Sequence, residues 1–421
     1  MKLELIILMV MLAIFAIGVF RLKIPAGVSL MMSAVAGGVI GGKGVPIRHL
    51  IEGGFGFLEA ILIIATAMIF MKVVNATGAL GTISYGMIKS FYRSPVMLMI
   101  VITVFIMFPG MLTGLSSACI LTTGALVVPG LLAMGMPRLA VGSLIAMAAV
   151  LGEVAPPICI PVMLIGGGVD MPYIGFGIPL FLASFPIAII LAIYYRYRYL
   201  NHFDINEVLS QLAKPVFTQH GLKLFIPLVF VITYLILEYS IPDKIPHLGV
   251  PLIFMIGALF GFGTGNKFNI FRVSREAIRD AMPVMSILVG VGMFLQIMTL
   301  TGVRGFLATN ALFLPEGLKY IAALLMPFFG SAYASASVIG VPLVYVFIGK
   351  SAIVVTAALA LLAAMGDLMP PPSLLCAYAA QMIQEKNHFK ILRMSILPIG
   401  ATMLVGLLII IYADKIAELI F

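Results

Sequence analysis

The sequence predicts an all-α polytopic membrane protein built from two inverted-topology repeats, each with a re-entrant helical hairpin and a discontinuous helix. Composition, the succession of apolar stretches and a resemblance between the two halves of the chain predict this fold class. Of the 421 residues, 62% are hydrophobic and 10% are charged, and the mean hydropathy is +1.19. Soluble domains are roughly half apolar and a quarter charged. The composition therefore indicates a chain that lies in lipid.

The apolar stretches are long enough to cross a membrane, which takes about 20 apolar residues per helix. Six precede a polar, basic connector and six follow it. The first six lie near 3–20, 25–42, 56–76, 96–134, 139–165 and 174–195, and the second six near 224–240, 249–265, 281–300, 319–349, 352–380 and 392–413. We expect a first inverted repeat at 1–195, a cytoplasmic basic connector at 196–223 and a second inverted repeat at 224–421. The stretch at 3–20 has no convincing cleavage site, so we expect a retained helix rather than a signal peptide.

The two halves resemble each other at fixed offsets, which indicates an internal duplication. Phe70, Thr77, Gly78 and Gly81 match residues 224 positions later. Gly-Glu-Val-Ala-Pro-Pro at 152–157 matches Gly-Asp-Leu-Met-Pro-Pro at 366–371, an offset of 214 (366 − 152), and we pair Ser117 with Ser331 at the same offset. The change of ten places between the blocks predicts a deletion in a connecting segment.

Basic residues gather in loops that we expect on the cytoplasmic side. These loops hold Arg196, Arg198, Lys214, Lys223, Lys267, Arg272, Arg275, Arg279, Lys386, Lys390 and Arg393. Counting spans from them places the N-terminus outside and gives the second half the opposite orientation, provided that 96–134 and 319–349 are hairpins. Lys43, Arg48 and Lys350 then fall on the outer side.

Composition and motifs exclude several function classes. The net charge of +9 is scattered over short loops and does not form a stripe with aromatic platforms, which argues against nucleic-acid binding. The full phosphate-binding loop Gly-x-x-x-x-Gly-Lys-Ser/Thr is absent, because Val344 stands where Gly349-Lys350-Ser351 would need the first glycine. All five histidines are expected in loops, where they build neither a triad nor a metal cluster with other residues. The chain therefore lacks the pair of nucleophile and base that an enzyme would need. The cysteines, Cys119, Cys159 and Cys376, lie in apolar segments and are expected to be packing residues.

Two apolar segments are too long and too interrupted for one straight helix. The first breaks at Thr113-Gly114-Leu115-Ser116-Ser117 and the second between Gly330 and Ser337, a stretch that contains Ser331 and Ser335. Broken backbone at membrane depth is tolerated where it lines a cavity or binds an ion. Half-helix N-termini suit a carboxylate, whereas carbonyl and hydroxyl oxygens suit sodium. Close helix packing through small residues is the alternative explanation.

Paired prolines follow acidic residues in both halves. Glu153 precedes Pro156-Pro157, and Asp367 precedes Pro370-Pro371-Pro372. Prolines remove amide donors, so we expect each helix to unwind here and expose carbonyls beside the hairpin tips. Acidic residues in apolar sequence are costly and are functional candidates. They could ligate a cation, take up a proton, or serve as structural carboxylates that accept hydrogen bonds from backbone amides.

These motifs resemble the large membrane subunit of TRAP transporters, within the ion transporter superfamily, over nearly the whole chain. Gly114-Leu115-Ser116-Ser117-Ala118 resembles the family's Gly-Ser-Ser-Ala tip. Residues 155–168 resemble its Ile-Pro-Pro-Ser-Ile-Pro stretch, and Met369-Pro370-Pro371-Pro372 its second Thr-Pro-Pro segment. Glu153 and Asp367 differ from the hydrophobic or small residues that the family has before the prolines, and Cys159 replaces its serine.

The resemblance implies an elevator-type carrier with a scaffold, a moving transport domain and Na⁺ as coupling ion, with no organic cofactor. It implies one cation site formed by Ser116, Ser117, Pro156 and Pro157, with a mirror site formed by Ser331, Ser335, Pro370 and Pro371. As acidic residues in apolar sequence, Glu153 and Asp367 are further candidate Na⁺ ligands. At the broken tips and proline breaks we expect substrate contacts at Thr113, Gly114, Ser116, Ser117, Pro157, Ser331, Ser335, Ser337 and Pro371.

The expected function is therefore secondary active uptake, by symport, of a small organic anion such as a dicarboxylate across a bacterial inner membrane. The expected partners are the lipid bilayer, a small four-helix membrane subunit and a periplasmic substrate-binding protein, with no nucleic acid. Three alternatives stay open at this point: coupling to H⁺, a stand-alone carrier of the same superfamily, and an ion channel.

Overall fold

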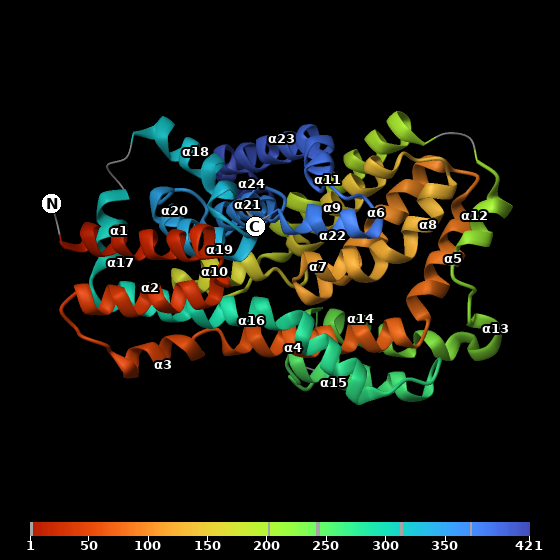
Figure 1. Ribbon diagram of the computed structural model, residues 1–421, viewed down its shortest axis with the longest axis horizontal. Coiled ribbons are helices and arrows are strands. Elements are labelled where there is room, and N and C mark those ends of the chain that lie inside the picture. The colour runs from red at the N-terminus through yellow and green to blue at the C-terminus, as the bar shows by residue number, and fades with distance from the viewer. Residues whose placement is uncertain (1–2, 201–202, 241–244, 312–314, 371–372) are drawn as a thin grey trace.

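The computed structural model describes residues 3–200, 203–240, 245–311, 315–370 and 373–421, and over these ranges the chain is helical without any β-strand (Figure 1). Eight of the described helices are long and apolar enough to cross a membrane. The fold class predicted from composition is thus confirmed as an all-helical, multi-pass membrane protein.

The first half of the chain contains five of the eight described helices that are long and apolar enough to cross a membrane, together with shorter pieces. Its elements are α1 (Leu3–Ala16), η1 (Ile17–Arg21), α2 (Ala26–Ile40), α3 (Ile47–Phe55), α4 (Leu58–Ala76), α5 (Ala79–Phe91), α6 (Pro95–Thr113), α7 (Ser116–Cys119), η2 (Ile120–Gly124), α8 (Ala125–Ala133), α9 (Arg138–Val154), α10 (Ile160–Gly168) and α11 (Gly177–Tyr199). The connector forms α12 (Ile205–Gln211), α13 (Phe217–His220) and η3 (Gly221–Phe225).

The second half repeats this order. Its elements are α14 (Ile226–Ser240), α15 (Val250–Phe260), η5 (Gly261–Gly263), α16 (Ile270–Leu300), α17 (Val303–Ala311), α18 (Glu316–Leu325), η6 (Met326–Phe329), α19 (Ala332–Ser335), η7 (Ala336–Gly340), α20 (Val341–Val346), α21 (Ala352–Ala364), η8 (Met365–Asp367), α22 (Leu374–Met382), α23 (Phe389–Ile411) and α24 (Ala413–Ile420).

Element boundaries repeat along the whole chain. The starts of α2 and α15 differ by 224 (250 − 26), as do those of α5 and α17 (303 − 79), and each of the latter follows a left-handed glycine, Gly78 or Gly302. The starts of α9 and α21 differ by 214 (352 − 138), and those of α11 and α23 by 212 (389 − 177). The repeat seen in short motifs therefore extends to helix lengths.

The helices form two layers, visible as the lower and upper parts of Figure 1. We call α1–α4 with α14–α16 the scaffold layer, in which α16 packs against α2, α3 and α4. Glycines bring these backbones together, because a Cβ on Gly290 would collide with the carbonyl oxygen of Gly27. We call α6–α11 with α18–α23 the hairpin layer, in which α9 packs against α6, α11 and α23.

The layers are connected by α5 and α17. The apolar stretches of the sequence did not predict these two helices. They are shorter and more polar than the membrane-crossing helices, as are α3 and α12, which were also missed. Arg304 on α17 bonds to the hairpin layer: its Nε donates to the Tyr345 hydroxyl (3.2 Å) and its guanidinium pairs with Asp170 at 2.7 Å. Arg304 therefore ties α17 to the hairpin layer through two specific partners.

Candidate cation and substrate site

Asp367 joins the starts of the two hairpin-tip helices. It ends η8 and is 5% exposed. Its Oδ1 accepts a hydrogen bond from the backbone amide of Ala332 (2.8 Å), and its Oδ2 accepts one from the Ser116 hydroxyl (2.9 Å). Ser116 is the first residue of α7 and Ala332 the first residue of α19. The interrupted helix of the second repeat therefore bridges both hairpins.

A direct hydrogen bond also connects the two tips. The hydroxyl of Tyr333, the second residue of α19, donates to the carbonyl oxygen of Gly114 at 3.0 Å. Gly114 has φ +67°, which ends α6 and turns the chain toward α7. Tyr333 is buried, at 4% exposed. Sequence reasoning did not select it, because its signal was a single tyrosine within a run of small residues.

Glu153 is the counterpart of Asp367 in the first repeat, but it lacks comparable partners. It lies near the end of α9 with no exposed surface, and neither carboxylate oxygen has a hydrogen-bond partner among the described residues. The Ser116 and Tyr333 hydroxyls lie near it, but they donate to Asp367 and Gly114. The repeats differ here because Ala332, the counterpart of Ser116, has no hydroxyl to offer.

The two acidic residues lie inside the hairpin layer without a cationic side chain as ion-pair partner among the described residues. The Glu153 and Asp367 carboxylates lie close enough to interact electrostatically. None of the ion pairs formed by the described residues includes either of them. Buried carboxylates are costly unless a cation or proton compensates them. Oxygen ligands at broken helices suit a small hard cation.

The first proline break is held by hydrogen bonds on both sides. Helix α9 ends at Val154, and the Pro156-Pro157 peptide bond is cis. The Ile158 amide donates to the carbonyl oxygen of Met111 on α6 (3.2 Å). The Tyr173 hydroxyl donates to the Pro157 carbonyl oxygen and accepts from the Cys159 amide, both at 3.0 Å. The unwound segment is thus fixed on one side to α6 and on the other to the loop that follows α10.

The second break is only partly described, since Pro371 lies outside the described residues. Its flanks show an exposed Pro370 and a left-handed Ser373 at φ +51°. The Ser373 hydroxyl donates to the carbonyl oxygen of Leu368 at 3.0 Å. Helix α22 starts at the next residue, Leu374. Both predicted interruptions are therefore real.

Glycines allow each interrupted helix to touch its hairpin. A Cβ on Gly152 would lie 2.6 Å from the Met107 carbonyl oxygen on α6. A Cβ on Gly366 would collide with the carbonyl oxygen of Gly330. Each glycine directly precedes the acidic residue of its repeat. The close approach positions Glu153 and Asp367 at the tips.

Several other predicted hydroxyls bond to backbone carbonyl oxygens three to five residues earlier in their own hairpin. Thr113 donates to the Pro109 carbonyl oxygen (2.7 Å), Ser337 to that of Tyr333 (2.8 Å) and Ser335 to that of Gly330 (3.4 Å). Ser117 is half-buried, and the Ser331 Oγ is buried without a partner among the described residues. The structure therefore gathers Gly114, Ser116, Glu153 and Asp367, while ligand binding by this set stays a prediction.

The sequence-based pairing of Ser117 with Ser331 is wrong. The left-handed glycines Gly114 and Gly330 differ by 216 (330 − 114), as do the π-helical turns η2 and η7 (336 − 120). Ser331 therefore takes the position of Leu115, and Ser117 that of Tyr333. The offset of 214 belongs to the proline motifs, because the segment between tip and break is two residues shorter in the second repeat.

No protein-family model matches the chain, and no curated protein sequence matches it. Among solved structures, the YdaH transporter of Alcanivorax borkumensis, which is described as having an unusual topology, is similar with a TM-score of 0.58. The sequences are 18% identical, and the match covers 87% of each chain. At this identity the likeness concerns the fold. The chain is a multi-pass membrane protein with a transporter fold.

Proposed function

We propose that the protein is a secondary active transporter that moves a small carboxylate across a bacterial inner membrane, coupled to Na⁺ by an elevator mechanism, as the large permease subunit of a TRAP-type system. The observation that carries the proposal is the double contact of Asp367 with Ser116 and Ala332. One buried carboxylate thus accepts a hydrogen bond from the start of each hairpin tip. A cation bound there would change how tightly the tips are held.

The chemistry of coupling follows from charge. Glu153 and Asp367 together present up to two negative charges in a closed, apolar interior, which opposes the entry of an anionic cargo. A bound cation offsets that charge, so cation and carboxylate each raise the affinity for the other. This reciprocal linkage is what a symporter requires. Proton coupling is the alternative that the lack of hydrogen-bond partners at Glu153 favours.

Two TRAP-type partners follow from the proposed family alone. A periplasmic binding protein would deliver the carboxylate, and a small four-helix subunit would adjoin the scaffold layer. Co-purification of the subunit with the chain tests that part of the proposal.

The test is uptake of radiolabelled succinate into proteoliposomes, driven by a sodium or a pH gradient. We expect sodium-driven uptake, weakened in Ser116→Ala, Ser117→Ala and Ser331→Ala with little loss of folded protein. Ser210→Ala, in the connector, is the matched control, because its hydroxyl bonds only to the Glu207 carbonyl oxygen on the surface. Uptake driven by a pH gradient without sodium would show that the coupling ion is a proton and not Na⁺. A conductance without saturable counterflow would indicate a channel.

A further inference from the structure

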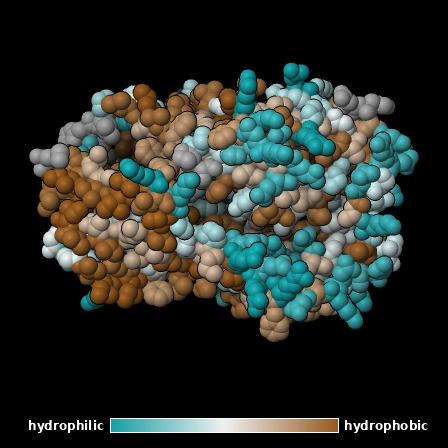
Figure 2. Space-filling view, in the orientation of Figure 1, coloured by the Kyte–Doolittle hydropathy of each residue, from teal (hydrophilic) through white to brown (hydrophobic). Residues whose placement is uncertain are grey.

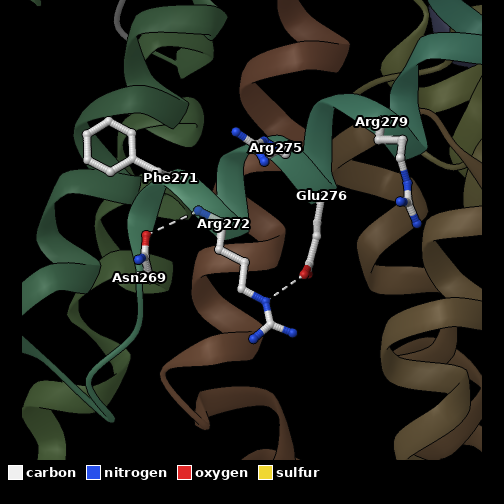
Figure 3. Close-up of a pocket in the computed structure, with 6 residues that line it drawn as sticks. All are labelled: Asn269, Phe271, Arg272, Arg275, Glu276 and Arg279. Carbon is white, nitrogen blue, oxygen red and sulfur yellow. Dashed lines mark hydrogen bonds and ion pairs between the residues drawn. The ribbon is translucent and has the colours of Figure 1, made fainter.

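The first turns of α16 extend beyond the apolar stretch that can lie in the membrane. The helix runs from Ile270 to Leu300, whereas the apolar part, 281–300, is by itself about 30 Å long, which matches the hydrocarbon thickness. Residues 270–280 therefore lie at the membrane surface. Five of them, Phe271, Arg272, Arg275, Glu276 and Arg279, line a hollow of about 400 Å³ together with Asn269 (Figure 3).

Two arginines in this segment have no counter-charge among the described residues. Glu276 pairs with Arg272 at 3.0 Å, and Asp280 pairs with Lys72 of α4 at 2.7 Å. Both acids of the segment are thus engaged. Arg275 and Arg279 are exposed and take part in none of the ion pairs that the described residues form. In Figure 3, Arg272 is turned to Glu276, whereas no dashed line reaches Arg275 or Arg279.

The unpaired arginines lie on a stripe that continues into the membrane. Phe271, Arg275, Arg279 and Met282 follow one another at spacings of four, four and three, which places them on one side of a helix. Phe271 is 83% exposed and Met282 is 54% exposed. An apolar surface directly below a cationic one suits a molecule with an anionic head and an apolar tail.

The first repeat shows that the fold does not require these arginines. At the offset of 224, Arg48 and Glu52 of α3 form the same ion pair as Arg272 and Glu276. The counterparts of Arg275 and Arg279 are apolar, Ile51 and Phe55, and both are exposed. Since the inverted repeats face opposite sides of the membrane, the two cations are added on one side only. The positive-inside pattern makes that side cytoplasmic.

We propose that Arg275 and Arg279 bind the phosphate of an anionic phospholipid in the cytoplasmic leaflet, with an acyl chain along Met282. Guanidinium groups present several N–H donors in a planar fork that matches phosphate oxygens. Basic pockets beside transmembrane helices on the cytoplasmic side bind such headgroups. The site lies in the scaffold layer, so a bound lipid would anchor the part of the molecule that an elevator holds still.

Thermal unfolding in nanodiscs tests the proposal. Discs of phosphatidylcholine alone are compared with discs that also contain phosphatidylglycerol. We expect phosphatidylglycerol to raise the unfolding temperature of the wild-type protein and this rise to be lost in Arg275→Gln/Arg279→Gln. The matched control is Arg48→Gln/Lys43→Gln, on the other side of the membrane. This variant should keep the rise in unfolding temperature that phosphatidylglycerol causes. Added salt should shrink the rise, because salt screens exposed charges.

Arginines beside a membrane helix also orient it during insertion. Variants that keep the charge separate this role from lipid binding. Arg275→Lys/Arg279→Lys keeps the charge that orients the helix but lacks the planar fork, and we expect correct insertion with a reduced lipid effect. Soluble glycerol phosphate, which has no acyl chain, should not reproduce the stabilisation. An equal rise in the wild type and the glutamine variant would overturn the proposal, as would full stabilisation by glycerol phosphate alone.

Discussion

The most informative residues are Glu153 and Asp367, which occupy equivalent places but have different surroundings. Asp367 accepts one amide and one hydroxyl hydrogen bond. Glu153 accepts none among the described residues. The missing hydroxyl hydrogen bond follows from one difference between the repeats, because Ala332 stands in the second repeat where the first has Ser116. We therefore assign Asp367 to holding the tips together and Glu153 to the exchangeable charge.

That assignment predicts unequal effects on stability. Asp367→Ala removes the acceptor of two buried donors and should destabilise the folded protein by about 1.5–3 kcal/mol. Glu153→Gln removes a buried charge without partners and should change stability by less than about 1 kcal/mol. Thermal unfolding in detergent ranks the two. Asp414→Ala is the control, since this exposed acid also accepts an amide bond, from Ser351. A larger loss for Glu153→Gln would contradict the assignment.

Tyr333→Phe isolates the contact between the tips. It removes only the hydroxyl that donates to Gly114, so we expect a loss of about 1 kcal/mol of stability and weaker sodium dependence of uptake. Tyr234→Phe, whose hydroxyl donates to the exposed Pro246 carbonyl oxygen at 2.9 Å, serves as control. If sodium dependence were unchanged in Tyr333→Phe, the tip contact would have no part in coupling.

At the scale of elements, long apolar stretches and proline pairs were sufficient to predict the membrane helices and both interrupted ones. The short helices α3, α5 and α17 were missed because their mixed polar sequences resemble loops. Contacts between the elements could not be predicted from the sequence, for a different reason. Ser116 and Asp367 are 251 residues apart, and nothing local in the chain indicates that they meet. The erroneous pairing of Ser117 with Ser331 has the same origin.

Close contact between η8 and the second hairpin predicts a steric effect at Gly366. An alanine there would push against the Gly330 carbonyl oxygen and the Ser335 hydroxyl, and overpacking of this kind costs about 1–3 kcal/mol. Gly400→Ala is the matched control, because a Cβ there meets nothing within 4 Å. Uptake and unfolding temperature should both fall in Gly366→Ala and persist in Gly400→Ala. Equal behaviour of the two variants would rule out a functional close approach.

At the scale of the molecule, two layers with separate internal packing favour rigid-body motion over local gating. Hydrophilic residues gather at the end that carries the connector helices α12 and α13, and the opposite end is largely hydrophobic on the face shown in Figure 2. The layers meet through small contacts, such as that between Phe57 of the scaffold layer and Gly167 of α10, where a Cβ would lie 2.7 Å from the ring. Sliding requires that such contacts break.

Locking the layers should therefore stop transport. We expect Phe57→Cys/Gly167→Cys, joined by a short bifunctional thiol reagent, to lose uptake, because the hairpin layer could no longer move along the scaffold. The native cysteines are buried and should not react. Gly54→Cys/Met293→Cys, a contact between α3 and α16 inside the scaffold layer, should keep its uptake after the same treatment, since an elevator leaves that layer intact. If both linked pairs transported equally, the layers would not move relative to each other, and local movement of the hairpin tips around Asp367 would have to supply alternating access instead.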